Sequence, residues 1–209
     1  LKREGILYLY KTKLGIKFIN YVGKKYKKVI NVIQYFSIAL GYVLMGGIFY
    51  VLINAVYTYI MFPEITDFIK APPIAPLIPY FPKIFGVESF FPPFYFTYFI
   101  IAVLIVAVVH EFSHGIFAKA KGLKIKSTGF AFLGPIVGAF VEPDEKRMLK
   151  KKKIDQMAIL SAGVFANIIT AIVFVFIAYL FLNLAFIQAG AIFTNYVASE
   201  ISISDIVSY

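Results

Sequence analysis

The sequence contains no cysteine, and only two of its 209 residues are histidine. Without cysteine, disulfides and thiolate metal sites are excluded, and cysteine usage gives no indication of the redox compartment. Charge is also scarce: charged residues make up 15% of the chain, whereas about a quarter is usual in soluble domains. Apolar residues make up 60%, above the usual share of about half. This composition indicates a membrane protein.

Three long stretches without charged residues, Val29–Phe62, Phe90–Val109 and Gln156–Ser199, are candidates for membrane spans. Crossing a bilayer takes about 20 apolar residues in a helix. We predict transmembrane helices over about 29–62, 94–118 and 158–187. The expected fold is therefore an all-α membrane protein with about three transmembrane helices.

A fourth uncharged stretch, "GFAFLGPIVGAFV" at 129–141, is too short to span. Its glycines and proline disfavour a helix, so we predict a re-entrant β-hairpin-like segment that turns near Gly134–Pro135. Irregular backbone is tolerated at membrane depth where it is buried in protein or lines a water-filled cavity. A surface hairpin among the lipid headgroups is the alternative. One strand edge could pair with an unwound substrate through backbone hydrogen bonds.

The basic residues are unevenly distributed along the chain. Nine precede the first predicted span, two lie in the 63–89 connection, ten lie between Lys119 and Lys153, and none follow. Because cytoplasmic loops are enriched in Lys and Arg, the N terminus and the 119–153 loop are expected inside and the C-terminal tail outside. The net charge of +10 therefore indicates topology and attraction to the lipid bilayer, and not nucleic-acid binding.

These patterns divide the chain into three parts. Residues 1–28 read as a basic N-terminal interfacial segment, residues 29–186 as a membrane-embedded core, and residues 187–209 as an extracytoplasmic tail. The Pro-rich connection 63–93 is expected to be an interfacial linker or a lid over a lateral opening. We expect a multi-pass protein of the cell membrane, and the initial Leu1 suggests a fragment.

The motif "HEFSH" at 110–114 carries the chemistry. Two histidines four residues apart lie on one face of a helix, and this pair with an intervening glutamate is the pattern of a zinc metalloprotease. His110 and His114 would bind Zn2+. Glu111 would activate a zinc-bound water as general base and then deliver the proton to the leaving amine. The alternative is a hydrogen-bonded polar patch between helices.

Two ligands leave such a zinc site incomplete, because catalytic zinc sites usually have three protein ligands. With no further histidine and no cysteine, the third must be Asp or Glu, and no other acidic residue lies in a predicted span. Either Glu142 or Asp144 approaches from the loop after the motif, or the ligand lies beyond residue 209.

The run "SAGVFANI" at 161–168 supplies small side chains at near-helical spacing. Small residues let membrane helices approach closely, so we expect the third helix to pack here against the helix with the histidines. Asn167 lies one turn from Gly163 and should face the same contact, either as an interhelical hydrogen bond or toward a substrate.

Together these segments resemble the site-2 protease family of intramembrane zinc metalloproteases. "HEFSHGIFAKAKGLKIKSTG" resembles the motif helix and its basic loop, "GFAFLGPIVGAFVEPDE" the following glycine-spaced segment, and "SAGVFANI" the signature alanine-glycine-proline-x-x-asparagine, with Val164 in place of proline. "YKTKLG" and the long first span resemble archaeal members with an extra leading helix. The resemblance covers most of residues 8–185.

The resemblance implies zinc-dependent hydrolysis, near the cytoplasmic face, of peptide bonds in single-span transmembrane protein substrates. It assigns His110 and His114 as zinc ligands and Glu111 as the catalytic carboxylate. Asn167 and Gly138 are assigned a supporting or substrate-positioning role. The family's third ligand is an aspartate followed by glycine in a later helix, and this sequence has no Asp-Gly pair. The tail could be the opening of a PDZ domain.

Two other functions remain open from the sequence. One is a catalytically inactive membrane scaffold or pseudoprotease, which the missing third ligand favours and the intact Glu111 disfavours. The other is a membrane zinc peptidase of the prenyl-protein protease type, whose third ligand is typically a glutamate in a downstream helix that this chain lacks.

Overall fold

The computed structural model describes residues 2–4, 7–62, 96–133 and 136–186 of the chain. The chain divides into two compact units, Leu1–Ile172 and Val173–Tyr209. The described part of the second unit continues helix α7 (Lys153–Ala185). The predicted linker or lid at 63–93 and the predicted tail at 187–209 lie outside the described residues.

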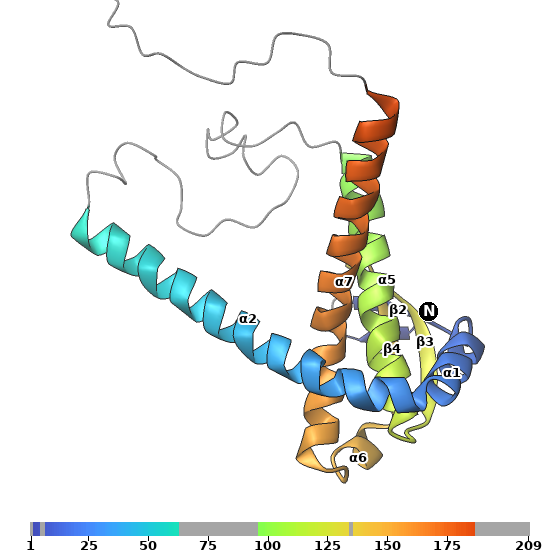
Figure 1. The fold of residues 1–209 in the computed structure, drawn as a ribbon. Coiled ribbons are helices and arrows are strands. Elements are labelled where there is room, and N and C mark those ends of the chain that lie inside the picture. Colours follow the sequence, from blue (N-terminus) through green and yellow to red (C-terminus); the bar gives the residue numbers. More distant parts are fainter. Residues whose placement is uncertain (1, 5–6, 63–95, 134–135, 187–209) are drawn as a thin grey trace, which may run out of the picture. The chain divides into compact units, whose positions relative to one another are not determined.

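Three long helices dominate the described chain: α2 (Lys27–Met61), α5 (Phe96–Ala120) and α7 (Figure 1). Each contains a window long and apolar enough to cross a membrane. Apolar side chains are exposed along all three, as expected for helices that face lipid. The predicted fold class, a mostly helical chain with about three spans, is confirmed.

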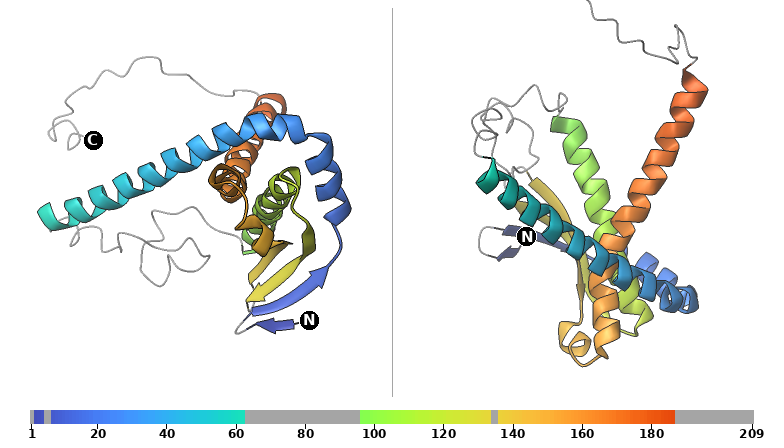
Figure 2. Two further views of the ribbon diagram at one scale, coloured as in Figure 1. Left: turned by 90° about the horizontal axis from the view of Figure 1, so that it is seen from below. Right: turned by 60° about the vertical axis from the view of Figure 1, so that its left-hand side comes forward.

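The described strands form a single small antiparallel sheet. Its members are β1 (Lys2–Glu4), β2 (Leu7–Thr12), β3 (Ile125–Leu133) and β4 (Ile136–Pro143). They follow the order β1-β2-β3-β4, so β4 is an edge strand. Figure 2 shows β2, β3 and β4 side by side next to α5.

Strands β3 and β4 form the predicted hairpin. Thr128 pairs with Val141 and Phe130 with Ala139. The strands extend beyond the predicted 129–141 at both ends, and the turn at 134–135 lies outside the described residues. Hairpin formation follows from the composition of the segment, since its β-branched and aromatic residues favour strands while its glycines and proline disfavour a helix.

The N-terminal segment contributes two strands, β1 and β2, and a helix that the sequence did not predict. Tyr10 of β2 pairs with Phe130 of β3, and α1 (Ile16–Lys25) follows. The connection requires Gly15, whose φ of +81° lies in the left-handed region that favours glycine. This segment is thus built into the same sheet as the hairpin.

Two glycines bring α5 against its neighbours. A Cβ atom on Gly23 of α1 would lie 2.7 Å from the Cβ of Lys119, and one on Gly115 of α5 would lie 2.9 Å from Cγ1 of Val141 and 3.1 Å from Cδ1 of Ile19. Real Cβ atoms need about 3.4 Å for ordinary contact. The C-terminal half of α5 is therefore held tightly between α1 and β4.

A polar cluster connects the residue after α5 with the N-terminal parts of α2 and α7. The ammonium of Lys121 lies 2.9 Å from Oδ1 of Asp155 on α7. It also donates to Oδ1 of Asn31 at 2.8 Å and to Oε1 of Gln34, both on α2. Since the Lys121 side chain is only 7% exposed, these partners compensate the burial of its charge. Helix α6 (Glu145–Met148) connects the hairpin to α7.

Candidate active site

The two histidines of the chain converge through their Nε2 atoms. Because they lie four residues apart on α5, their side chains share one face. Nε2 of His110 lies 3.1 Å from Nε2 of His114, and the rings meet edge to face with centroids 4.7 Å apart. Two imidazole nitrogens at about 2.0–2.1 Å from one tetrahedral zinc ion would lie about 3.3 Å apart. The pair therefore fits two ligand positions of a single zinc ion.

A backbone carbonyl of α7 determines which nitrogen of His114 is available. Nδ1 of His114 lies 2.6 Å from the carbonyl oxygen of buried Ile159. A carbonyl oxygen only accepts hydrogen bonds, so Nδ1 must carry the proton and donate. In the neutral ring the lone pair then lies on Nε2, the atom that faces His110. Metal-binding histidines are commonly oriented by such a bond from the other ring nitrogen.

Gly163 of α7 packs directly against both imidazoles. A Cβ atom at this position would lie 2.5 Å from Cε1 and from Nε2 of His110, and closer still to Nε2 of His114. Any side chain would occupy the place where the two Nε2 atoms converge. The predicted contact between the small-residue run and the histidine helix is confirmed at Gly163. Ser161 faces a different helix, since its hydroxyl lies 2.8 Å from that of Ser37 on α2.

Glu111 lies on the side of α5 that faces the sheet edge. Its Oε2 accepts a hydrogen bond of 3.1 Å from the backbone N–H of Val141 on β4. The carboxylate is half-buried. The histidines face α7 and Glu111 faces β4, so the polar groups of α5 line the region between α7 and the sheet edge.

The other carboxylates considered as third ligands have different partners. Oε2 of Glu142 lies 2.9 Å from Nζ of Lys11 and accepts a hydrogen bond of 2.5 Å from the hydroxyl of Ser127. The Ser127 hydroxyl, and after it Lys11, hold the pKa of Glu142 below its usual value. Asp144 caps α6 through the N–H of Arg147. Among the described residues, no group of three or more His, Cys, Asp or Glu side chains could hold a metal.

Asn167 and Gly138, the remaining sequence-predicted residues, lie in different environments. Asn167 follows Gly163 by one turn of α7, and its Oδ1 is buried without a hydrogen-bond partner in the described part of the chain. Gly138 lies on β4 opposite Ala131, whose carbonyl oxygen, at 4.0 Å, is the nearest atom to a Cβ built there. The structure thus leaves an unsatisfied polar atom one helical turn from Gly163 and room for a Cβ atom at Gly138.

Two contacts of this site could not have been found from the sequence. The carbonyl of Ile159 orients His114, and the N–H of Val141 binds Glu111. Every residue type offers these main-chain groups, so residue identity gives no signal for them. The signal that did exist was the spacing of Gly163 and Asn167, which places both on one face of a helix.

Comparison with known proteins places this geometry in a family. The model of peptidase family M50 matches residues 98–207, a range that contains the histidine motif, the hairpin and α7. The match covers more than half of the chain. The chain belongs to peptidase family M50.

An uncharacterised protein of the archaeon Methanocaldococcus jannaschii is 37% identical to this M50 chain over 167 residues. The aligned region covers 79% of this chain and 41% of that relative, so the chain spans well under half of the relative's length. No solved structure matches the chain.

Family M50 comprises the site-2 protease-type metallopeptidases, which are generally zinc-dependent. Membership of M50 and the three long apolar helices establish an integral membrane protein of a protease family. Membership also decides against the prenyl-protein protease alternative.

Proposed function

We propose that this chain is the core of a zinc-dependent intramembrane endopeptidase that cleaves transmembrane proteins near the cytoplasmic face. One observation carries the proposal: the Nε2 atoms of His110 and His114 converge at 3.1 Å while the adjacent Glu111 carboxylate lies at β4, an edge strand of the sheet that the described residues form. In this proposal the two histidines would bind the metal, Glu111 would act as general base, and the β4 edge would bind an extended peptide.

His110 and His114 would hold the zinc ion, and the third ligand would be a carboxylate outside the described residues. When bound, zinc would polarise the scissile carbonyl and lower the pKa of a water. The Ile159 carbonyl keeps Nε2 of His114 free to bind metal, and Gly163 leaves room around both nitrogens.

Glu111 would move the protons of the reaction. One oxygen of its carboxylate is held by the N–H of Val141, which fixes the group at the sheet edge. The carboxylate would accept a proton from the attacking water and donate it to the amine of the leaving peptide. General acid–base catalysis of this kind contributes about 10²–10⁴-fold to a rate.

The β4 edge would bind the substrate as an added strand. The N–H of Val141 points away from β3 toward Glu111. Since the two sides of an antiparallel strand alternate in their hydrogen bonds, Ala139 and Val137 present their backbone groups on that same outer side. A transmembrane helix hides its peptide bonds, so the substrate must first unwind, and strand addition would stabilise the unwound form. The buried Oδ1 of Asn167 would accept a peptide N–H.

The proposed location follows from the charge distribution. The N terminus and the 119–153 loop carry 19 of the 21 basic residues, which favours a cytoplasmic position for both in the cell membrane. Lys119 of α5 lies five residues after His114 in the sequence, so cleavage would occur close to that face. Single-span transmembrane proteins are the proposed substrates.

Glu111→Gln in the full-length protein tests this proposal. We expect the variant to retain zinc, because the ligands are intact, and to lose at least about 10²-fold in cleavage of a single-span substrate in vesicles. Glu145→Gln, which changes an exposed acid on α6, is the matched control and should cleave normally.

Cleavage that survives Glu111→Gln would overturn the proposed mechanism. The inactive scaffold would instead be supported by a wild-type protein that binds a transmembrane peptide but does not bind zinc and does not cleave the peptide. The absence of a third ligand among the described residues favours this alternative.

A further inference from the structure

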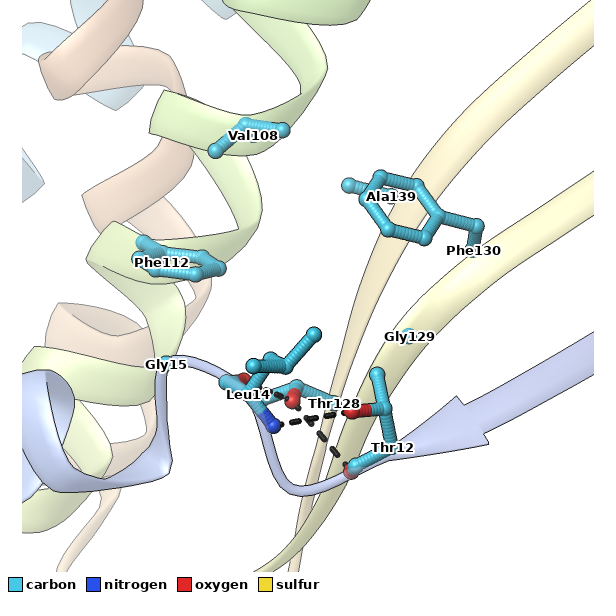
Figure 3. Close-up of a pocket in the computed structure, with 9 residues that line it drawn as sticks. All are labelled: Thr12, Leu14, Gly15, Val108, Phe112, Thr128, Gly129, Phe130 and Ala139. Atoms are coloured by element: carbon cyan, nitrogen blue, oxygen red, sulfur yellow. Dashed lines mark hydrogen bonds between the residues drawn. The ribbon is translucent and has the colours of Figure 1, made fainter.

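A small apolar cavity lies between α5 and the sheet and is lined in part by Phe112 of the histidine motif. It has a volume of about 130 Å³. Val108 and Phe112 line it from α5, Phe130 and Ala139 from the hairpin, and Leu14 from the segment before α1. In Figure 3, Phe130 and Ala139 point from their strands toward α5.

The cavity offers an occupant almost no polar group. Of its two threonines, Thr12 accepts the N–H of Leu14 at 2.9 Å through its hydroxyl. Thr128 donates its hydroxyl to the carbonyl oxygen of Leu14. With both hydroxyls engaged, the remaining lining is aliphatic and aromatic. Such a cavity favours an apolar group, and an apolar cavity of about 150 Å³ can hold a benzene molecule.

The register of the hairpin places this cavity beside the proposed substrate strand. Ala139 precedes Val141 by two residues, so their side chains lie on one face of β4. Val141 contacts Gly115 of α5 on that face and binds Glu111 through its N–H. Residues directly opposite each other on paired strands point to the same face. A peptide residue opposite Ala139 would therefore direct its side chain to the face of the sheet on which Ala139 lines the cavity.

We infer that this cavity is a side-chain subsite that selects an aliphatic residue in the substrate, about 7 Å along the strand from Glu111. The inference rests on the proposed function, because it assumes that a peptide pairs with β4. Ala139 and Val108 limit the size of the accepted side chain from the two walls. The subsite would give the enzyme a preference at one position of an otherwise apolar transmembrane segment.

The test uses the full-length protein in phosphatidylcholine–phosphatidylglycerol vesicles with a series of single-span peptides. Each peptide of about 25 residues is rich in alanine and carries one leucine, which moves by one position through the series. We expect wild-type cleavage to be fastest when the leucine stands at one fixed distance from the scissile bond. One apolar group in a pocket changes kcat/KM by about 10–200-fold.

Ala139→Leu fills the cavity and should lower the ratio of kcat/KM for the preferred leucine peptide to kcat/KM for the all-alanine peptide at least about tenfold. Ala131→Leu is the matched control, since it adds the same side chain to the opposite face of the sheet, where the paired residue, Gly138, has no side chain. Should Ala139→Leu fail to fold, Val108→Ala provides the complementary test: the enlarged cavity should shift the preference from leucine to phenylalanine.

A readout without activity separates this inference from the proposed function. In the Glu111→Gln protein, photo-leucine at the preferred position should crosslink to Val108 or Phe112, and at neighbouring positions it should not. Crosslinking without any wild-type cleavage would refute the proposed function and leave the peptide subsite intact. Cleavage without a positional preference, or a preference unchanged in folded Ala139→Leu, would overturn the subsite.

Discussion

Replacement of Gly163 by alanine tests the contact that positions both histidines. The added Cβ would lie 2.5 Å from two atoms of the His110 ring, whereas ordinary contact begins at 3.4 Å. Helix α7 or the rings must therefore move by about 1 Å, and such overpacking typically costs about 1–3 kcal/mol. The movement also stretches the bond between His114 and the Ile159 carbonyl, and loss of such an orienting bond costs about 10–100-fold in metal affinity.

The assay is zinc binding by competition with a chromophoric chelator, together with the thermal unfolding midpoint in detergent. We expect Gly163→Ala to bind zinc about 10–100-fold more weakly than wild type and to unfold at a lower temperature. Gly46→Ala on α2 is the matched control, since its Cβ would meet no atom within 4 Å. This variant should bind zinc as tightly as the wild type and should not unfold at a lower temperature. Wild-type zinc affinity and stability in Gly163→Ala would refute the contact between α7 and the histidines.

Two further predictions concern the loop end of the helices and the hairpin. Lys121→Met leaves the partly buried Asp155 without its cation and should lower the free energy of unfolding by about 3 kcal/mol. The control variant Lys124→Met changes an exposed position and should have little effect. Equal unfolding midpoints of the two variants would contradict this role of Lys121. The lowered pKa of Glu142 means that its stabilising contribution is complete above the usual value of 4.5 and is lost as the pH falls through the lowered pKa. Thermal unfolding between pH 7 and 3 should therefore depend less on pH in Glu142→Gln than in the wild type. At neutral pH the free energies of unfolding of the two proteins should differ by about 0.2–1 kcal/mol, because the pair with Lys11 is partly exposed. An identical pH profile in both proteins would contradict this role of Glu142.

Much of the fold was predictable because it follows from local composition. Uncharged runs about 20 residues or longer indicate membrane helices, and the three observed long helices confirm that reading. The hairpin was predictable because its glycines and Gly134–Pro135 interrupt an apolar stretch too short to span. In both cases the decisive information lies within one segment of the chain.

Strand β2 shows why the rest was not predictable. Its residues alternate between aromatic, aliphatic and basic types, and next to the lysines of α1 they read as an amphipathic surface segment. The strand exists because Tyr10 meets Phe130, a partner 120 residues away. Pairing over such a distance is decided by the assembled structure and not by local propensity.

The candidate site was likewise predictable only in part. The spacing of His110 and His114 predicts a shared helix face, and the structure brings their Nε2 atoms together. The hydrogen bonds that orient the site come from the main chain of Ile159 and Val141, which no motif encodes. The orientation of Ser161 toward Ser37 was equally unpredictable, because small residues allow close approach without specifying the neighbour.

The central claim is that His110 and His114 bind one zinc ion together. Zinc-edge X-ray absorption of the zinc-loaded full-length protein tests it most directly, because imidazole gives a distinctive scattering pattern. The account predicts one zinc ion per chain with two imidazole nitrogens at about 2.0–2.1 Å, and loss of this signal in the double variant His110→Ala, His114→Ala. Stoichiometric zinc with no imidazole ligand, or an unchanged spectrum in the double variant, would contradict it.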